Sequence, residues 1–255
     1  MMDIRSVFEK IAKEYPEAKK QKLKNHPLAK FIRLEVPKSF KEDLGQTISK
    51  YKVLVAKHAG NWSSVAWIVL LDPRVSETAT RGYYPVYSFF ENGKKIMLSL
   101  GQGYRDIKSE YKNEADDILI SRGIILKNKA GDYKKFGFKN VHGTKITIKS
   151  DKMREVWVKS CAFGKVYDVK NLPSNNELIN DAKNILNIYE NIIQRGGTSE
   201  LIENIDPEEV EIIKDLSGSE KKALKKHREH EKYYIKTDPK FIKSLKKKFD
   251  YTCQA

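Results

Sequence analysis

Four strand-like segments between residues 51 and 100 constrain the fold more than any other feature of this sequence. Residues 51–55 alternate in polarity, and residues 65–71 form a continuous apolar run. An apolar run of this length is typical of a strand that is buried on both faces. Residues 84–90 and 95–100 flank Glu91-Asn92-Gly93-Lys94, and Asn-Gly between two such segments predicts a tight hairpin. The sequence therefore predicts an antiparallel meander.

Helical patterns flank this meander. Residues 4–14 carry apolar side chains at helical spacing, and we expect Pro16 to end this helix or to restart the chain after it. Residues 17–50 are rich in lysine and combine helix with loop. Gly101-Gln102-Gly103 indicates a turn that closes the meander, because it lacks the lysine and the third glycine of a phosphate-binding loop. Residues 104–129 return to a helical apolar pattern.

The following region combines strands with one long helix. Further strand-like pieces lie at 144–148, 156–159 and 163–169. Ser174 and Glu177 have the spacing of a capping box, and a long amphipathic helix continues from there to Arg195-Gly196-Gly197. We place a domain boundary at this point, after residues 1–195. The pattern predicts an α+β fold, a twisted and mostly antiparallel sheet flanked by helices.

The charge of the chain points to a polyanionic partner. The 255 residues carry a formal net charge of +15, with a membrane surface as the competing explanation. No apolar run approaches the ~20 residues that span a bilayer, and the N-terminus lacks the apolar core of a signal peptide. We therefore expect a cytoplasmic protein without a membrane-spanning segment. The only cysteines, Cys161 and Cys253, do not suggest a disulfide framework.

Nearly half of this charge lies close to the C-terminus. Residues 218–255 hold 12 Lys and Arg against 5 Asp and Glu, so that their net charge is 12 − 5 = +7. Residues 196–250 contain few large apolar side chains, and we expect them to form a basic helical extension.

Aromatic residues and glycines gather around the predicted strands. Trp62 and Trp67 follow Gly60, and Tyr84 follows Gly82. Such rings usually pack a sheet against helices, which is one interpretation. The other is a pocket that stacks an unpaired base, because glycines permit a ligand to approach the backbone and the positive charge attracts nucleic acid. The residue types alone leave both interpretations open.

Two further motifs are explained better without a functional role. Asp168-Val169-Lys170 has the acid-x-Lys order of metal-dependent nucleases, but a chain with this much lysine produces it by chance. His227 and His230 lie three residues apart without a clear third ligand, so a solvated helix face explains them better than a metal site.

The aromatic and glycine pattern resembles the N-terminal DNA-binding domain of McrB, the recognition subunit of modified-cytosine-dependent restriction systems. The motif stands here as Gly60-Asn61-Trp62-Ser63-Ser64-Val65-Ala66-Trp67, followed by Gly82-Tyr83-Tyr84-Pro85-Val86-Tyr87 and the hairpin. Gly101-Gln102-Gly103 and residues 163–173 also fit, and the resemblance covers roughly residues 5–195. Ala66 occupies the place of a proline in the family motif.

This resemblance implies a domain that binds double-stranded DNA and flips a methylated or hydroxymethylated cytosine into an aromatic pocket. Its pocket positions fall on Trp67, Tyr84, Ser88 and Ala59. The associated DNA-binding positions are Gly60, Asn61, Trp62, Ser63, Lys57, Arg81 and Tyr83. Ala59 and Ser88 stand where larger or apolar residues are expected. The pocket is therefore roomier and more polar, which suggests hydroxymethylated or larger adducts.

The C-terminal extension carries a second resemblance, to readers of this type that are fused to HNH endonucleases. His227-Arg228-Glu229-His230-Glu231 leads through a Lys-rich stretch to Cys253, the position of the first cysteine in a Cys-x-x-Cys zinc pair. Residues 251–255 would then begin an HNH domain. On this interpretation Cys253 is the only candidate metal ligand. The chain itself carries no catalytic residues and no cofactor, and zinc and a divalent metal belong to the HNH domain beyond it.

Three functional hypotheses follow from the sequence. The first is a reader of modified cytosine in duplex DNA, which is compatible with a homodimer. The second is a complete metal-dependent nuclease within these residues, and the third is a general RNA- or single-strand-binding module.

Overall fold

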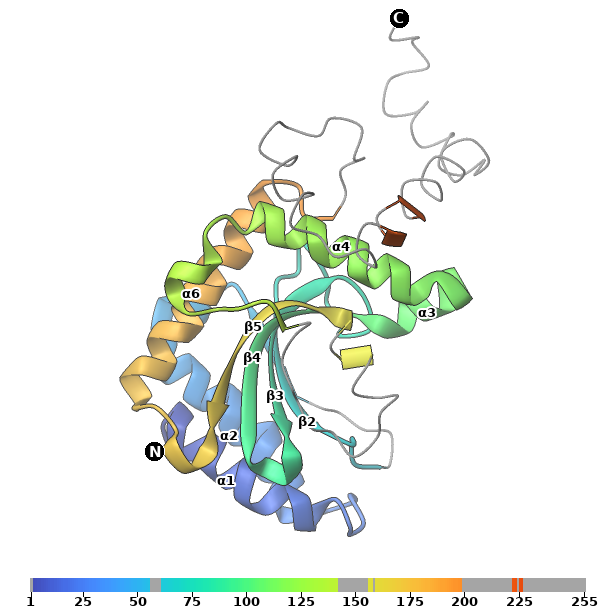
Figure 1. The fold of residues 1–255 in the computed structure, drawn as a ribbon. Helices are drawn as coiled ribbons and strands as arrows, with labels where there is room; N and C mark the ends of the chain where they lie inside the picture. The colour runs from blue at the N-terminus through green and yellow to red at the C-terminus, as the bar shows by residue number, and fades with distance from the viewer. Residues whose placement is uncertain are drawn as a thin grey trace, which may run out of the picture.

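A single antiparallel sheet organises the protein. The structure is a computed structural model that describes residues 2–55, 61–141, 156–157, 159–198, 222–223 and 225–226. The described strands lie side by side in the order in which they occur in the chain, which is the arrangement of a meander (Figure 1). The strands are β1 (Lys52–Val55), β2 (Ala66–Leu71), β3 (Tyr83–Phe90), β4 (Lys95–Gln102) and β5 (Cys161–Asp168). The predicted antiparallel meander and fold class are thus confirmed.

Helices precede the sheet, interrupt it and follow it. The α-helices are α1 (Ile4–Ala18), α2 (Pro27–Leu44), α3 (Tyr104–Tyr111), α4 (Ala115–Lys129) and α6 (Asn175–Gln194). Short 3-10 turns are η1 (Gly45–Ile48), η2 (Glu91–Gly93), η3 (Lys112–Glu114), η4 (Tyr133–Phe136) and η6 (Val169–Asn171). The capping box at α6 is confirmed, because the Ser174 hydroxyl accepts from the Glu177 amide and the Glu177 carboxylate accepts from the Ser174 amide.

The predicted Asn-Gly hairpin joins β3 to β4. Asn92 and Gly93 both adopt left-handed backbone angles, with φ of 55° and 81°, as a tight turn between twisted strands requires. A Cβ on Gly93 would lie 1.8 Å from the carbonyl oxygen of Ala12, so α1 packs directly against this turn. The turn therefore needs glycine both for its backbone angle and for its close approach to α1.

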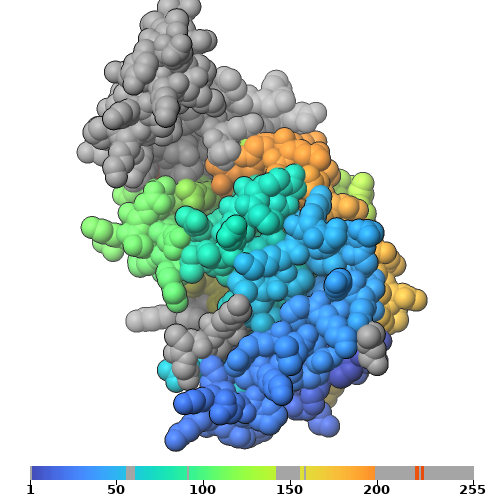
Figure 2. Space-filling model, turned by 180° about the vertical axis from the view of Figure 1, so that it is seen from behind, coloured from blue at the N-terminus to red at the C-terminus, as the bar shows by residue number. Residues whose placement is uncertain are grey.

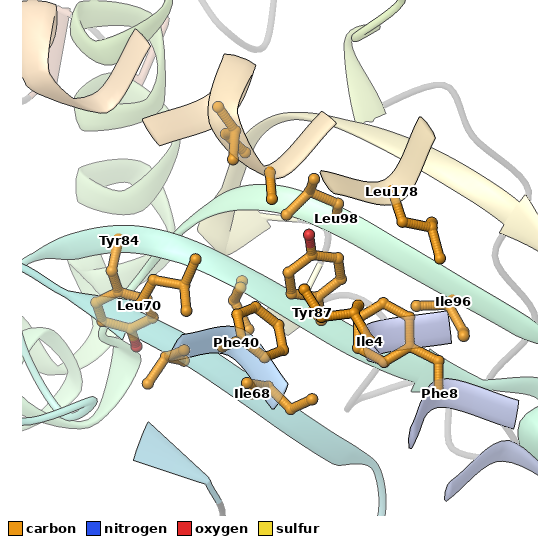
Figure 3. Close-up of a cluster of buried hydrophobic side chains, with 14 of the residues drawn as sticks. Ile4, Phe8, Phe40, Ile68, Leu70, Tyr84, Tyr87, Ile96, Leu98 and Leu178 are labelled. Atoms are coloured by element: carbon orange, nitrogen blue, oxygen red, sulfur yellow. The ribbon is translucent and has the colours of Figure 1, made fainter. Parts of the chain in front are cut away.

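One face of the sheet packs against α1, α2 and α6. These helices lie together along the sheet (Figure 1), and in the view from behind the N-terminal third forms a continuous blue surface (Figure 2). Phe8 of α1 and Phe40 of α2 contact the ring of Tyr87 at centroid distances of 4.8 and 5.7 Å. Figure 3 shows these rings at the centre of the main core, with Ile96 and Leu98 of β4 nearby. These helices therefore pack against β3, the central strand of the sheet.

The other face of the sheet is also covered in its central part. All eight residues of β3 are buried, as expected for a strand enclosed on both sides. Phe90, Met97 and Cys161 form a smaller core with Val65, and Trp157 packs against it. Residues 156–157 and 159–160 are helical, so the prediction of a strand at 156–159 was wrong. Helical packing of Trp157 onto the sheet replaces the expected strand pairing.

Two glycines expected in a turn lie elsewhere in the structure. Gly101 and Gln102 belong to β4, and Gly103 caps α3. The side-chain amide of Gln102 donates to the carbonyl of Leu119 in α4 at 2.9 Å, which ties α4 to the end of the sheet. The expectation of a turn at 101–103 was therefore wrong, since Gly101 remains paired with Tyr84.

The first helix is longer than the sequence suggested. α1 runs to Ala18 with Pro16 inside it. Pro16 has no amide hydrogen, so it cannot donate the helical hydrogen bond to the carbonyl of Ala12. This is the only helical bond that the missing amide removes. A proline in the last turn thus costs one hydrogen bond and does not end the helix, contrary to the prediction.

A short part of the C-terminal extension contacts α4. Ala223 is fully buried, and the ammonium of Lys226 lies 2.5 Å from the carboxylate of Asp117. The rest of the predicted extension and the strand expected at 144–148 lie outside the described residues. No helix in the described part of the chain has both the length and the apolar character needed to cross a membrane.

Candidate nucleic-acid interface

Trp67 and Ser88 lie opposite each other on neighbouring strands. The register of β2 and β3 pairs Trp67 with Ser88 and Val69 with Val86. Because directly paired residues project from the same face of a sheet, Trp67 and Ser88 share the face opposite α1, α2 and α6. Tyr84 projects from the same face, four residues before Ser88 on β3. Three of the four predicted pocket positions therefore project from one face of the sheet.

A recess opens beside Trp67 at the edge of β2. Its volume is about 280 Å³, close to the lower end of the ~300–1,000 Å³ that small-ligand pockets occupy. We call it the β2 recess, and it is lined by Ile11, Leu23, Ala29, Ile32, Arg33, Trp62, Ala66, Trp67, Ile68 and Phe89. Its walls are mainly apolar and contain two indoles. Ala66 and Phe89 are direct partners and project toward α1 and α2, so the recess lies on the helix side of the sheet edge and does not reach Ser88 or Tyr84. Such a recess accepts a planar, weakly polar group.

The strand register explains why the recess forms at this point. β1 pairs with β2 only from Ile68 to Leu71, so Ala66 and Trp67 extend beyond Val55, the last residue of β1. Within the described ranges no strand pairs with this end of β2 on its β1 side, and the recess lies between it and the helices α1 and α2. Trp67 is half-buried there, whereas Ile68 is fully enclosed.

Ser88 contains an unusual buried hydroxyl. The residue is fully buried, and among the described residues its Oγ has no hydrogen-bond partner. A buried hydroxyl without a partner destabilises a fold by roughly 1–3 kcal/mol. Hydroxyls of this kind are uncommon in proteins and call for a specific explanation. A ligand that reaches this face is one such explanation.

Tyr84 has a fixed orientation. Its hydroxyl donates to the carbonyl of Ala79 at 2.6 Å, and the side chain is only 6% exposed. Burial raises the pKa of Tyr84, so the phenol stays protonated and keeps this bond. Four residues of strand separate the Cα atoms of Tyr84 and Ser88 by roughly 13 Å. Tyr84 does not line the β2 recess. It lies on the same sheet face as Ser88, but farther along β3 from Trp67.

The loop before β2 is fastened to the connection between α1 and α2. The indole nitrogen of Trp62 donates to the carbonyl of Gln21 at 3.0 Å. The Trp62 ring also contacts Tyr15 and His26 edge-on, at 5.2 and 5.1 Å. The hydroxyl of Tyr15 donates to the carbonyl of Ser63 at 3.0 Å. These contacts hold Trp62 and Ser63 close to the recess.

The remaining predicted contact residues differ in position. Asn61 and Arg81 are exposed. Asn61 lies in the loop before β2, and Arg81 lies just before β3. Tyr83 is buried on the opposite face, where its ring packs edge-on against Tyr189 at 5.7 Å. Burial raises the pKa of Tyr83 to about 12. Tyr83 therefore lies apart from the surface that Trp67 and Ser88 share.

Four predicted residues lie outside the described part of the chain, namely Lys57, Ala59, Gly60 and Cys253. Within the described residues, no group of three or more His, Cys, Asp and Glu is arranged to hold a metal ion. Asp168 has a local role, because its carboxylate accepts from the amide of Lys170 at 3.0 Å.

Sequence reasoning missed the contribution of the N-terminal helices. Leu23, Ala29 and Arg33 line the β2 recess, and Tyr15 fixes the loop before β2. Only one signal in the sequence could have suggested this. Basic residues recur between 19 and 33 without an acidic residue among them.

The protein is thus an α+β domain with an apolar recess at one edge of its antiparallel sheet. The family model described as "MrcB-like, N-terminal domain" matches residues 10–194. The chain therefore belongs to the family of McrB-like N-terminal domains, as the motif around Trp67 and Tyr84 predicted. A search of curated proteins found no match.

Proposed function

We propose that this protein is a DNA-binding module that recognises modified cytosine by flipping the base out of the duplex. The observation that carries the proposal is the position of Trp67. The family motif assigns Trp67 to the base pocket, and the same residue lines a recess of about 280 Å³. An aromatic wall beside an apolar recess is what an extruded base needs for stacking.

The energies of base flipping are compatible with this site. Unstacking and unpairing one base costs a few kcal/mol. Stacking on an aromatic side chain returns ~1–3 kcal/mol per base, and phosphate contacts supply much of the remaining affinity. A chain with a net charge of +15 favours such phosphate contacts.

Each residue of the site has a proposed role. Trp67 stacks on the extruded base in the β2 recess. The family motif assigns Tyr84 to the same pocket, but Tyr84 does not line the recess, so its role here is to hold the sheet face behind Trp67. Asn61, Ser63 and the backbone near Gly60 position the edge of the base. Lys57 and Arg81 contact phosphates, together with lysines of the C-terminal extension. Ala59 contributes space where the family has an aromatic residue.

Ser88 is the proposed determinant of the modification. Its hydroxyl lies opposite Trp67 in the register and lacks a partner among the described residues. In this proposal a 5-substituent that extends from the β2 recess past Trp67 to the Ser88 side would supply that partner through its own hydroxyl, whereas a methyl group would not. A site that bonds a ligand hydroxyl discriminates strongly against ligands that lack it. We therefore propose hydroxymethylated cytosine, or a larger polar adduct, as the preferred base.

The same family relationship suggests a biological setting. We propose that this reader is the specificity part of a modification-dependent restriction endonuclease that acts in the cytoplasm against modified phage DNA. The HNH nuclease in this proposal would follow Cys253 in a longer protein. The alternative of a complete nuclease within these residues predicts metal-dependent cleavage of DNA by the purified chain.

A gel-shift titration tests the proposal directly. One duplex is prepared with cytosine, 5-methylcytosine or 5-hydroxymethylcytosine at a single position, and the corresponding single strands serve as competitors. We expect the modified duplexes to bind about tenfold or more tightly than the unmodified one. Equal affinity for all three duplexes would contradict modified-base recognition. Preference for the single strands would favour a general single-strand-binding module.

A further inference from the structure

A second cationic region lies in the N-terminal part of the protein, far in sequence from the basic extension. Residues 18–34 contain five lysines and one arginine and no acidic residue. This stretch covers the end of α1, the connection to α2 and the first turns of α2. We call residues 19–33 the N-terminal basic segment. Its charge is concentrated in a short, folded part of the chain.

Most of this charge is not neutralised within the protein. Lys22, Lys24, Lys30 and Arg33 are exposed, and none of them has an ion-pair partner among the described residues. Lys20 differs, because it lies 2.6 Å from the carboxylate of Glu17. Four unpaired cations close together repel one another and attract a polyanion.

The N-terminal basic segment is part of the rim of the β2 recess. Leu23 and Ala29 line the recess, and so does Arg33, whose side chain is exposed. The segment also receives the indole bond of Trp62 through the carbonyl of Gln21. The ammonium of Lys19 lies 3.5 Å from the carbonyl of Ser64 on the loop before β2. The N-terminal basic segment therefore contacts both the β2 recess and the loop before β2 that carries Trp62.

We propose that the N-terminal basic segment binds the phosphate backbone of the duplex beside the extruded base. This inference rests on the proposed function for the identity of the base. It adds a contact surface that the sequence motif does not contain. Phosphates held by Lys22, Lys24, Lys30 and Arg33 would place the unpaired base over the recess. Contacts of this kind fix register and orientation and carry no sequence information.

The packing of α2 favours DNA over a membrane surface. A helix that binds a membrane presents its apolar face outward, toward the lipid. The apolar residues Ile32, Val36 and Phe40 of α2 are instead buried in the main core. The exposed side of α2 presents Lys30 and Arg33. Leu34 of α2 is also exposed, at 57%, but one leucine beside Lys30 and Arg33 is not the apolar face that a membrane-bound helix needs. A cationic surface next to a recess with two indoles fits nucleic acid.

Salt-dependent binding measures these phosphate contacts. The variant K22Q/K24Q/K30Q/R33Q is titrated with a duplex of about 20 base pairs, with and without one 5-hydroxymethylcytosine, at roughly 50–200 mM salt. Each lost phosphate contact lowers the slope of log K against log salt by about 0.9. We expect the slope to fall by about 2–4, equally on both duplexes.

A control variant removes the same charge elsewhere. Lys134, Lys139, Lys170 and Lys183 are exposed and lie near β5, at the opposite edge of the sheet, or on α6 beside it. The variant K134Q/K139Q/K170Q/K183Q has the same net charge as the test variant, so any difference reports position. We expect its slope to change by less than about 1. Equal slopes for the two variants would overturn the proposal.

The remaining outcomes are also decisive. All substituted side chains are exposed, so both variants should unfold at the wild-type temperature. The pairs K22Q/K24Q and K30Q/R33Q should each produce about half of the slope change. Loss of binding to phosphatidylserine-containing vesicles with unchanged duplex binding would overturn the proposal in favour of a membrane. If the wild-type chain does not distinguish modified from unmodified duplex, the proposed function fails, whereas the slope difference still supports this surface.

Discussion

Trp67 of β2 and Ser88 of β3 are direct partners across the sheet, one half-buried at the rim of a recess and the other fully enclosed. This pairing puts a stacking surface and an unsatisfied hydroxyl on neighbouring strands. It also assigns two properties of the proposed pocket to different residues. Stacking of the base depends on Trp67, and discrimination between substituents on the cytosine depends on Ser88. Substitutions at the two positions should therefore have different effects.

Replacement of Trp67 by alanine should weaken binding to the modified duplex by about ten- to a hundredfold. The reason is the loss of stacking of one base, ~1–3 kcal/mol. Trp67→Phe keeps an aromatic ring and should retain most of the affinity. Gel-shift titration of both variants with modified and unmodified duplex checks this. Affinity for unmodified DNA should change far less, and an equal loss on both duplexes would argue against a pocket role.

Replacement of Ser88 by alanine should change base preference without harming the fold. The substitution removes a buried hydroxyl that makes no hydrogen bond among the described residues, so the free energy of unfolding should stay the same or rise by up to about 1 kcal/mol. Preference for hydroxymethylated over methylated cytosine should fall by about tenfold. Chemical denaturation and competitive gel shifts measure the two effects.

Ser99→Ala provides the matched control for this prediction. Ser99 is also fully buried, but its hydroxyl lies 3.4 Å from the sulfur of Cys161. Its removal should lower the free energy of unfolding by about 0.5–1 kcal/mol. Base preference should not change. A stability loss in Ser88→Ala as large as in Ser99→Ala would show that Ser88 has a bonding partner after all.

The sequence predicted the parts of this fold that depend on local patterns. The apolar run of β2, the Asn92-Gly93 turn and the Ser174 capping box each follow from residue types at fixed spacing. The same patterns failed where tertiary packing decides. Pro16 remains inside α1 because a missing donor near a helix end costs little. Residues 156–157 are helical, and Trp157 packs its ring against Phe90 at 6.0 Å.

The candidate site was predicted only in part for a similar reason. The spacing of Trp67 and Tyr84 identified the family, which the family model then supported. The contributions of Leu23 and Arg33 to the recess depend on how the connection between α1 and α2 folds back over β2. Such a contact joins residues about forty positions apart, and no local periodicity encodes it. Only the recurrence of basic residues between positions 19 and 33, with no acidic residue among them, hinted at a role for this segment.

Replacement of Gly93 by alanine should destabilise the fold far more than replacement of Gly131. Both glycines have positive φ, 81° and 64°, which costs alanine about 1–2 kcal/mol. A Cβ at Gly131 meets no atom within 4 Å, whereas one at Gly93 would lie 1.8 Å from the carbonyl oxygen of Ala12. Relief of this clash requires α1 to move from the hairpin.

Urea denaturation of the two variants measures the difference. We expect Gly131→Ala to lose about 1 kcal/mol and Gly93→Ala to lose at least 1–2 kcal/mol more, roughly the cost of a strained core contact. Similar losses for both would mean that the backbone angle alone determines the effect. In that case the packing of the hairpin against α1 would contribute nothing.

The last prediction concerns acid stability, because a charged network ties the end of β2 to α6. The guanidinium of Arg74 lies 2.7 Å from the carboxylates of both Asp72 and Glu190, and Lys50 also pairs with Glu190. The hydrogen bonds from Arg74, and then from Lys50, lower the pKa of Glu190 to about 2. Burial alone would raise the pKa of Asp72, but its bonds to Arg74 outweigh this and lower it.

A lowered pKa in the folded state fixes the sign of the pH dependence. The carboxylates stabilise the fold at any pH above their ordinary values, near 4. This stabilisation is lost as the pH falls from about 4.5 toward the folded pKa of Glu190, about 2. Glu190→Gln should therefore lower the free energy of unfolding at pH 6 by about 1 kcal/mol, since solvent screens the half-exposed side chains of Arg74 and Lys50. The difference from wild type should shrink as the pH approaches 2.

Urea denaturation at pH 6, 4.5 and 3 tests this prediction, with Arg74→Lys as the comparison. Lysine keeps the charge but cannot bond both carboxylates with a planar fork, so its pH dependence should be intermediate. Arg74→Ala leaves the buried Asp72 carboxylate without its ion-pair partner and should cost about 1–3 kcal/mol at pH 6. If Glu190→Gln had the same pH profile as wild type, the network would not be what links α6 to β2.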